Sequence, residues 1–167
     1  MTAIVAADKH WGIGRNGALL TRIPADMQRF RELTYGKVVI LGRKTLQTFP
    51  QGRPLDGREN IIMSRNTSFR VKGAQVVRSE EELFKVLSFY PEEDVYVIGG
   101  GQVYLQLLKY CTTCLVTRLD RVFDADAYFP DLDALDAWSL VEESDEQTYF
   151  DTPYTFCTYV RTQSGAG

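Results

Sequence analysis

The chain has 167 residues, 44% of them hydrophobic and 25% charged, which is the composition of one globular domain able to bury its own core. Nineteen Lys and Arg against 22 Asp and Glu leave a net charge of −3, which argues against a nucleic-acid or membrane-surface role. A single histidine, His10, excludes a His-rich metal site and leaves one position around which a Ser-His-Asp triad could form.

The N-terminal apolar run, residues 3–7, is far shorter than a signal peptide or a membrane span. We therefore expect a cytoplasmic protein. The chain has an odd number of cysteines, Cys111, Cys114 and Cys157, and is large enough to bury a core without disulfide bonds. We therefore expect free thiols.

Short runs of apolar or β-branched residues predict strands at 3–7, 38–41, 60–63, 95–98 and 115–117. Runs that are apolar on both faces are typical of strands covered by helices. Helices are predicted after Pro24 and before Gly36, after the cap-like Ser79, and over residues 102–109.

This alternation predicts an α/β fold with a mostly parallel central sheet of about eight strands and helices on both faces. Residues 138–141 and 155–160 read as strands with no helix between them, so the sheet should end in a C-terminal antiparallel hairpin. Residues 12–17 and 120–136 are expected to be loops. Residues 1–162 should form one domain, and residues 163–167 a frayed tail.

Two strand-to-helix turns are rich in glycine or positive charge. Gly99, Gly100 and Gly101 follow one predicted strand, where free backbone N–H groups can hold a pyrophosphate. The motif is neither G-x-G-x-x-G nor a Walker A loop, so a purely structural turn remains open. The second turn, residues 42–45, places two cations and a hydroxyl after another strand.

Two candidate phosphate sites suggest a dinucleotide. Ser64 and Arg65 close a third strand, so Arg43, Lys44 and Arg65 could gather at one sheet edge and select a 2′-phosphate, hence NADP. The alternative is that these are solvated surface side chains.

Asp26 lies in the first turn of a predicted helix beside the apolar Met27 and Phe30, so its carboxylate could border an apolar pocket. The alternative is a carboxylate that only stabilises the helix dipole. Arg58, in a predicted turn, could clamp a substrate carboxylate, or could simply be exposed. The C-x-x-C spacing of Cys111 and Cys114 lacks a second ligand pair and is attributed to chance.

Six ordered motifs together resemble dihydrofolate reductase, from Ile4 to about Val160. They are Gly12-Ile13-Gly14-Arg15-Asn16-Gly17, Ile23-Pro24-Ala25-Asp26, Val39-Ile40-Leu41-Gly42-Arg43-Lys44-Thr45, Arg53-Pro54-Leu55-Asp56-Gly57-Arg58-Glu59-Asn60-Ile61-Ile62, Val97-Ile98-Gly99-Gly100-Gly101-Gln102-Val103-Tyr104 and Tyr128-Phe129-Pro130.

The resemblance implies reduction of 7,8-dihydrofolate by NADPH, with hydride going to C6 and a proton to N5. Asp26 then resembles the acid that binds the pterin and promotes protonation, and Thr117 the hydroxyl that joins it. The apolar surroundings should raise the pKa of Asp26. The implied substrate site comprises Ile4, Val5, Met27, Phe30, Phe49, Leu55, Arg58 and Ile98, with Arg58 on the glutamate α-carboxylate and the carbonyls of Ile4 and Ile98 as acceptors.

The implied cofactor site comprises Ala6, Ile13, Gly14, Gly42, Arg43, Lys44, Thr45, Ser64, Arg65, Gly99, Gly100, Gly101, Gln102, Val103 and Tyr104. No metal is implied, and the expected partner is the small-molecule substrate, bound by a monomer. Residues 12–20 resemble the family's mobile active-site loop, whose closure would exclude water.

Two positions depart from the family's usual pattern. Thr21 stands where relatives usually carry tryptophan, which puts loop rigidity and the proton route in question, and Ala125 stands where some carry glycine.

Three alternative functions are a pyrimidine-nucleotide reductase of riboflavin synthesis, a catalytically silent binding module, and a metal or redox protein built on Cys111 and Cys114. The Pro24-Ala25-Asp26 element and Arg58 favour the folate enzyme.

Overall fold

The computed structural model describes residues 1–162, and the predicted tail at 163–167 lies outside the described residues. Its helices are α1 Pro24–Thr34, α2 Arg43–Gln47, α3 Glu80–Leu87 and α4 Gly101–Leu107. Its strands are β1 Thr2–Ala7, β2 Gly12–Arg15, β3 Ala18–Leu19, β4 Val38–Gly42, β5 Glu59–Met63, β6 Ala74–Val77, β7 Val95–Gly99, β8 Thr113–Leu119, β9 Ala127–Tyr128, β10 Trp138–Glu143, β11 Gln147–Tyr149 and β12 Thr152–Arg161.

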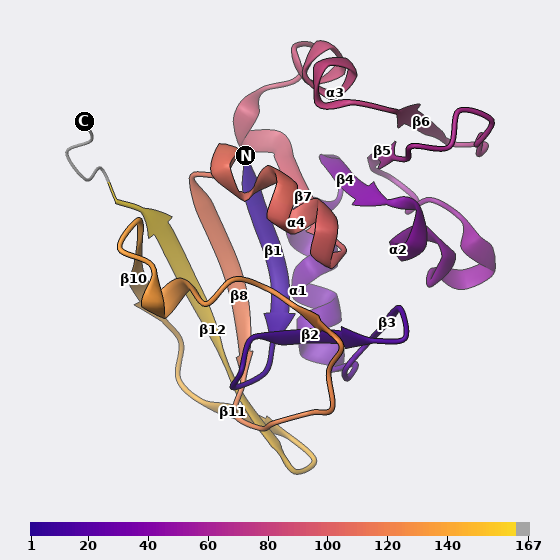
Figure 1. Ribbon diagram of the computed structural model, residues 1–167. Coiled ribbons are helices and arrows are strands. Elements are labelled where there is room, and N and C mark those ends of the chain that lie inside the picture. The colour runs from indigo at the N-terminus through magenta and orange to yellow at the C-terminus, as the bar shows by residue number, and fades with distance from the viewer. Residues whose placement is uncertain (163–167) are drawn as a thin grey trace.

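One large twisted sheet organises the molecule, in the strand order β10-β12-β8-β1-β7-β4-β5-β6, with β11 pairing with β12. The pairs from β8 to β6 are parallel. The pairs that involve β12 are antiparallel. Figure 1 shows α4 in front of this sheet and α1 behind it. The predicted mostly parallel sheet with an antiparallel C-terminal part is confirmed.

The central strands are apolar on both faces because both faces are covered. Val39, Ile40 and Leu41 of β4 are all fully buried, and they divide between two hydrophobic clusters on opposite sides of the sheet. Successive side chains of a strand point to opposite faces, so one continuous apolar run supplies both clusters.

The helix boundaries follow the predicted signals. Pro24 is the first residue of α1, and Gly36, just past its end, has a φ of 78°, a conformation that glycine adopts without strain. The Ser79 hydroxyl accepts a hydrogen bond from the Glu82 N–H at 3.1 Å and caps α3. The helix predicted at 102–109 ends earlier, at Leu107, and continues as a 3₁₀ turn, Leu108–Tyr110.

Two segments predicted as loops contain short strands. Residues 12–17 include β2, which pairs with β3 and β9 in a separate three-stranded sheet, and residues 120–136 include β9 and the 3₁₀ turn Leu132–Ala134. Backbone pairing between distant segments stabilises these strands, and such pairing leaves no periodic pattern in the sequence.

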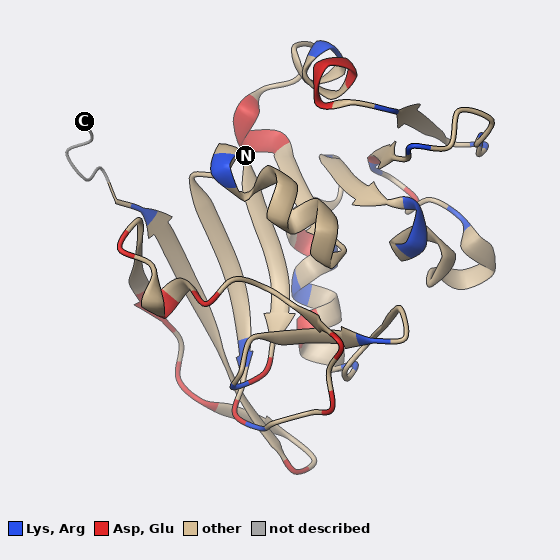
Figure 2. Ribbon diagram, viewed as in Figure 1, with Lys and Arg blue, Asp and Glu red and all other residues tan. Residues whose placement is uncertain are grey.

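Charge is distributed unevenly over the fold. Residues 43–78 carry eight of the nineteen Lys and Arg but only two of the 22 Asp and Glu, giving this segment a charge of +6 and the rest of the chain −9. Figure 2 shows Lys and Arg around α2, β5 and β6, and acidic residues on α3 and along the loops beside β2.

Candidate active site

The central contact of the site joins a helix to the middle of the sheet. The Thr117 hydroxyl on β8 donates a 2.6 Å hydrogen bond to Oδ1 of Asp26 on α1. Both residues were candidates, and the structure brings them together although 91 positions separate them in the chain. The bond fixes the orientation of the Asp26 carboxyl group and leaves its second oxygen for a ligand.

Burial raises the pKa of the Asp26 carboxyl group above its ordinary value. Desolvation is the largest cause, and the hydrogen bond from Thr117 and the positive charge of Arg29 act in the opposite direction. A carboxyl group whose pKa is raised by desolvation is suited to acid–base chemistry. This environment favours a chemical role for Asp26 over the alternative of a simple helix cap.

The predicted apolar lining of the substrate site comes from α1 and from one face of the sheet. Met27, which is 37% exposed, and the half-buried Phe30 belong to α1. Phe49, Leu55 and Ile98 pack against the cluster that β4 and β5 form on one face of the sheet. These five of the predicted substrate-binding residues therefore come from the elements that would form the walls of a pocket.

Two other predicted substrate residues lie on β1. Ile4 is buried, and its carbonyl already accepts a 2.6 Å hydrogen bond from the Tyr104 hydroxyl. Val5 is partly buried and packs against the larger hydrophobic cluster. Burial raises the pKa of Tyr104, so its hydroxyl keeps the proton that it donates to Ile4. The family resemblance implied that Tyr104 belongs to the cofactor site, and the structure gives its hydroxyl an internal partner.

Arg58 is half-buried beside the C-terminal end of α1. Its Nε donates to the Thr34 hydroxyl at 3.0 Å and its Nη1 to the Asp56 carbonyl at 3.1 Å, which fixes the guanidinium while leaving other N–H donors for a ligand. The guanidinium also lies over the ring of Phe30, 5.9 Å from its centroid. Arg58 is therefore held by α1, and is not a freely solvated turn residue.

Sequence reasoning missed a second cation at this end of the helix. Burial, and then the like charge of Arg31, lowers the pKa of Arg58, and both guanidinium groups lie over the Tyr35 ring. Two cations close enough to repel each other favour an anionic ligand between them. Arg31 lies one helical turn after Met27, and this i, i+4 spacing is the signal that could have identified it.

The two predicted phosphate turns meet at the carboxyl ends of neighbouring strands. β4 and β7 are adjacent and parallel, with Leu41 opposite Gly99. A Cβ atom added to Gly100 would lie 3.0 Å from the Thr45 hydroxyl, and one added to Gly42 would lie 3.1 Å from Val103. The glycines thus allow the turns to approach closely. No side chain caps α2 or α4, so the first N–H groups of both helices are left without a side-chain acceptor. Gly101 and Gln102 follow the second turn as the first two residues of α4.

The predicted cationic edge is formed by the ends of adjacent strands. β4 and β5 run parallel in register, with Gly42 opposite Met63, so Arg43 and Lys44 follow one strand where Ser64 and Arg65 follow its neighbour. The Arg43 guanidinium lies 5.7 Å from the centroid of the Phe69 ring. The geometry is that expected for a charged edge able to select an anionic group.

Asp8 connects the segment before β2 to a distant loop. It is 1% exposed, and its Oδ1 accepts hydrogen bonds from the backbone N–H groups of His10 at 2.9 Å and Gly12 at 2.8 Å. Its Oδ2 accepts one from the N–H of Phe123 at 2.9 Å. One carboxylate thus satisfies three donors and ties together the two segments that flank the small sheet.

The small sheet holds the predicted nicotinamide neighbours Ile13 and Gly14, both buried, while Ala6 on β1 lies opposite Thr117. The N–H of Asn16 donates to Oδ2 of Asp126 at 3.0 Å. Instead of an unpaired loop, residues 12–15 form a strand joined to β9.

Ala125 explains a requirement for glycine at position 12. A Cβ atom added to Gly12 would lie only 2.6 Å from the Cβ of Ala125, closer than two such atoms can approach. The Ala125 side chain is therefore accommodated by the absence of a side chain at position 12.

Other candidate chemistry is not supported in residues 1–162. Cys111, Cys114 and Cys157 are free and buried, and burial raises the pKa of the Cys111 thiol to about 11. Within these residues, no group of three His, Cys, Asp or Glu side chains could hold a metal ion, and no helix is long and apolar enough to cross a membrane.

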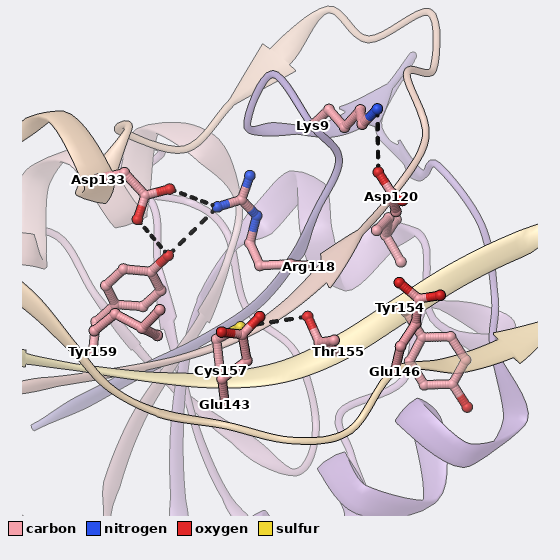
Figure 3. A pocket seen from close by; sticks show the side chains of 12 residues that line it. Lys9, Arg118, Asp120, Asp133, Glu143, Glu146, Tyr154, Thr155, Cys157 and Tyr159 are labelled. Carbon is pink, nitrogen blue, oxygen red and sulfur yellow. Dashed lines mark hydrogen bonds and ion pairs between the residues drawn. The ribbon is translucent and has the colours of Figure 1, made fainter.

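A cleft of about 350 Å³ opens on the sheet face opposite Thr117 (Figure 3). Arg118 follows Thr117 on β8 and so points to that other face. Its Nη1 donates to Asp133 at 3.0 Å, Tyr159 donates to the same carboxylate at 2.8 Å, and Lys9 pairs with Asp120 at 3.2 Å. The cations of this cleft are therefore already paired with carboxylates.

Known proteins match this chain over nearly its whole length. The family model described as dihydrofolate reductase matches residues 1–161. The dihydrofolate reductase of Mycobacterium leprae is 43% identical over 130 residues, which are 75% of this chain and 76% of that protein. The dihydrofolate reductase of Staphylococcus haemolyticus is 35% identical over 165 residues, 96% of this chain and 95% of that protein.

A solved structure agrees with these sequences. Dihydrofolate reductase from Enterococcus faecalis, complexed with NADP(H) and RAB-propyl, matches with a TM-score of 0.82 and 30% identity, covering 96% of this chain and 95% of that one. Fold and relatives together define an oxidoreductase. The chain belongs to the dihydrofolate reductase family, as its motifs predicted.

Proposed function

We propose that this NADPH-dependent oxidoreductase reduces 7,8-dihydrofolate to tetrahydrofolate, and so supports one-carbon metabolism. The observation that carries the proposal is the half-buried Asp26 carboxyl group on α1, which is held by the Thr117 hydroxyl of β8. A pterin offers N–H groups that a carboxylate can bind and a flat apolar surface that suits such walls.

The residues at the two glycine turns fit NADPH. Gly42 and Gly100 lack side chains where a Cβ would crowd Val103 and Thr45, so the two turns lie close together, and their backbone N–H groups suit the pyrophosphate. Arg43 and Arg65 would hold the 2′-phosphate, assisted by the other proposed cofactor residues of both turns. When bound, NADPH supplies the hydride that reaches C6 of the pteridine ring.

Asp26 is proposed to promote proton delivery to N5. The carboxyl group would hold the pterin through N3 and the 2-amino group, and its raised pKa keeps a proton available closer to neutral pH. Thr117 fixes the carboxyl orientation, and the small β2-β3-β9 sheet would exclude water from the reacting atoms.

Arg58 is proposed to bind the glutamate α-carboxylate of the substrate. Its anchoring by Thr34 and the Asp56 carbonyl orients the guanidinium in advance, which reduces the entropy lost on binding. Met27, Phe30, Phe49 and Leu55 would contact the pterin and aminobenzoyl rings.

Further proposals concern the whole chain. Residues 1–162 are proposed to act as one domain and as a monomer. A cytoplasmic location is supported by the three free cysteines, since reduced thiols are usual in that compartment.

The test is a turnover assay with NADPH and dihydrofolate on the parent and on Asp26→Asn. We expect the parent to be active and the variant to lose roughly 10²–10⁴-fold at neutral pH, the range for a general acid–base group. Lower pH should partly rescue the variant, because substrate protonated in solution needs less help.

Asp94→Asn is a matched control, because Asp94 is also a partly buried, hydrogen-bonded carboxylate but pairs with Lys37 at the opposite end of β7. It should keep parental turnover. Hydride transfer by Asp26→Asn at the parental rate at pH 7 would return Asp26 to the role of a helix cap. No turnover by the parent would refute the proposed function.

A further inference from the structure

Arg29 lies one turn after Asp26 on α1, and its guanidinium rests on an aromatic ring of the sheet. Its Cζ is 4.4 Å from the centroid of the Phe156 ring on β12. Phe156 is the direct strand partner of Thr117, the residue that donates to Asp26. Asp26 is therefore connected to the sheet twice: directly through its hydrogen bond from Thr117, and indirectly through Arg29, which contacts the strand partner of Thr117.

The cation–π contact holds a positive charge at a fixed place near the carboxyl group. Residues three apart on a helix are surface neighbours. Without the ring, a long arginine side chain would extend into water, where its charge would be screened. The positive charge of Arg29 lowers the pKa of Asp26, against the larger effect of burial.

Several other groups face this pair. The Thr117 hydroxyl approaches Asp26 from β8, and the buried Tyr104 of α4 is close enough that the Asp26 charge raises the pKa of its hydroxyl. On its outer side, Arg29 lines a groove of about 280 Å³ together with Glu142, Glu143, Ser144, Phe156 and Thr158. Although two glutamates line the same groove, the Arg29 guanidinium lies over the Phe156 ring, and this contact keeps its charge on the side of Thr117 and Asp26.

We propose that Arg29, seated on Phe156, is a positioning residue that sets the pH range over which Asp26 carries its proton. The inference rests on the proposed function of Asp26 as the group that promotes protonation. It adds a second determinant, outside the substrate pocket, to the pH dependence of the reaction. Its direction is specific: the cation restricts activity at alkaline pH.

Arg29→Gln tests the proposal by removing the charge while keeping a long polar side chain. Neutralising a nearby cation disfavours the carboxylate, so we expect the apparent pKa of the hydride-transfer rate to rise by about half a unit to one unit. Above that pKa the variant should be about three- to tenfold faster than the parent. A purely structural role would make the variant slower at every pH.

Two further variants separate the effect of the Arg29 charge from that of its contact with the Phe156 ring. Arg29→Lys retains the positive charge and should keep the parental pH profile nearly unchanged. Phe156→Leu retains Arg29 but removes the ring, and should shift the profile in the same direction as Arg29→Gln by a smaller amount. If Arg29→Gln unfolds, Phe156→Leu still decides the question.

A direct titration of the carboxyl group makes the result independent of turnover. The ¹³C resonance of Asp26, assigned by its absence in Asp26→Asn, should titrate at higher pH in Arg29→Gln than in the ligand-free parent. The same titration midpoint in both proteins overturns the proposal, even if the parent reduces dihydrofolate. A shifted midpoint in a parent without that activity would support the electrostatic effect and refute the proposed function instead.

Discussion

Replacing Asp8 by alanine removes a buried carboxylate that accepts three backbone hydrogen bonds from two distant segments. Hydrogen bonds to a charged group contribute roughly 1.5–3 kcal/mol each to stability. Only the bond from Gly12 is fully buried, so water can replace part of the other two after truncation. We therefore expect a loss of about 3–5 kcal/mol in the free energy of unfolding, well below the sum of three separate bonds.

Asp8→Asn should be milder because its amide oxygen can still accept from His10 and Gly12 at the position of Oδ1. The amide nitrogen would then face the N–H of Phe123, so one bond is lost, at about 1.5–3 kcal/mol. The order of stability is thus parent, asparagine variant, alanine variant.

Equilibrium urea unfolding measures these free energies, and thermal unfolding provides a second measurement. At about 2–4 °C per kcal/mol for a chain of this size, Asp8→Ala should melt roughly 6–20 °C below the parent. Asp124→Ala is the control, because Asp124 lies in the same loop but is 86% exposed and makes only a surface ion pair with Arg15, 3.0 Å away. An Asp8→Ala variant within about 1 kcal/mol of that control would refute the assigned role of Asp8.

Four other outcomes are expected. Arg58→Ala should weaken dihydrofolate binding by about 1–3 kcal/mol in calorimetry, less than for a fully buried pair, and should leave pterins without the glutamate tail unaffected. Equal losses for both ligands would assign Arg58 to the fold. Alanine at both Arg43 and Arg65 should remove about 1.5–3 kcal/mol of NADPH affinity per side chain and leave NADH affinity nearly unchanged; a retained preference for NADPH would refute that site. Gly57→Ala should destabilise the fold by more than about 1 kcal/mol, because it adds an overlap with the Tyr35 ring to the strain of a φ of 75°. Gly17→Ala, with a similar φ and open space, isolates the strain alone, and equal losses would exclude the overlap. Asp26→Asn should stabilise the protein relative to the parent increasingly from pH 4 upward, because a folded-state pKa above the unfolded value means that the parent loses stability as its buried carboxyl group ionises. A stability difference independent of pH, measured by thermal unfolding, would contradict that assignment.

Burial explains why much of the fold could be predicted. β4 is covered on both faces, so Val38 to Leu41 form one unbroken apolar run, and β5 has a shorter apolar run from Ile61 to Met63. Local residues determine where α1 begins and ends: Pro24 is its first residue and Gly36 lies just past its end. In each case one short segment contains all the information that its structure needs.

The small sheet could not be predicted in this way. Its strands β2, β3 and β9 have four, two and two residues, too short to show a period. They form because Asp8, Asp126 and the backbone of β9 satisfy donors more than a hundred positions away. Tertiary contacts of this kind determine local structure without leaving a local signal.

The residues of the candidate site also divide into those that local sequence could predict and those that depend on distant contacts. The position of Asp26 in the first turn of a helix follows from neighbouring residues, whereas its contact with Thr117 on β8 was implied only by the family resemblance. Arg31 and Asn60 were missed as functional positions. Asn60 is buried at 3% exposure and accepts from the N–H of Leu55 while donating to the carbonyl of Arg58, so it shapes the substrate turn from within β5.

The uneven distribution of charge has a consequence for how ligands arrive. With +6 on residues 43–78 and −9 on the remainder, the molecule is an electric dipole whose positive end contains the proposed cofactor edge. A polyanion such as NADPH would be turned and drawn toward that end before any contact forms, while the acidic remainder repels it from unproductive approaches. The association rate should therefore decrease steeply with added salt while the dissociation rate changes little, although the protein as a whole is negatively charged.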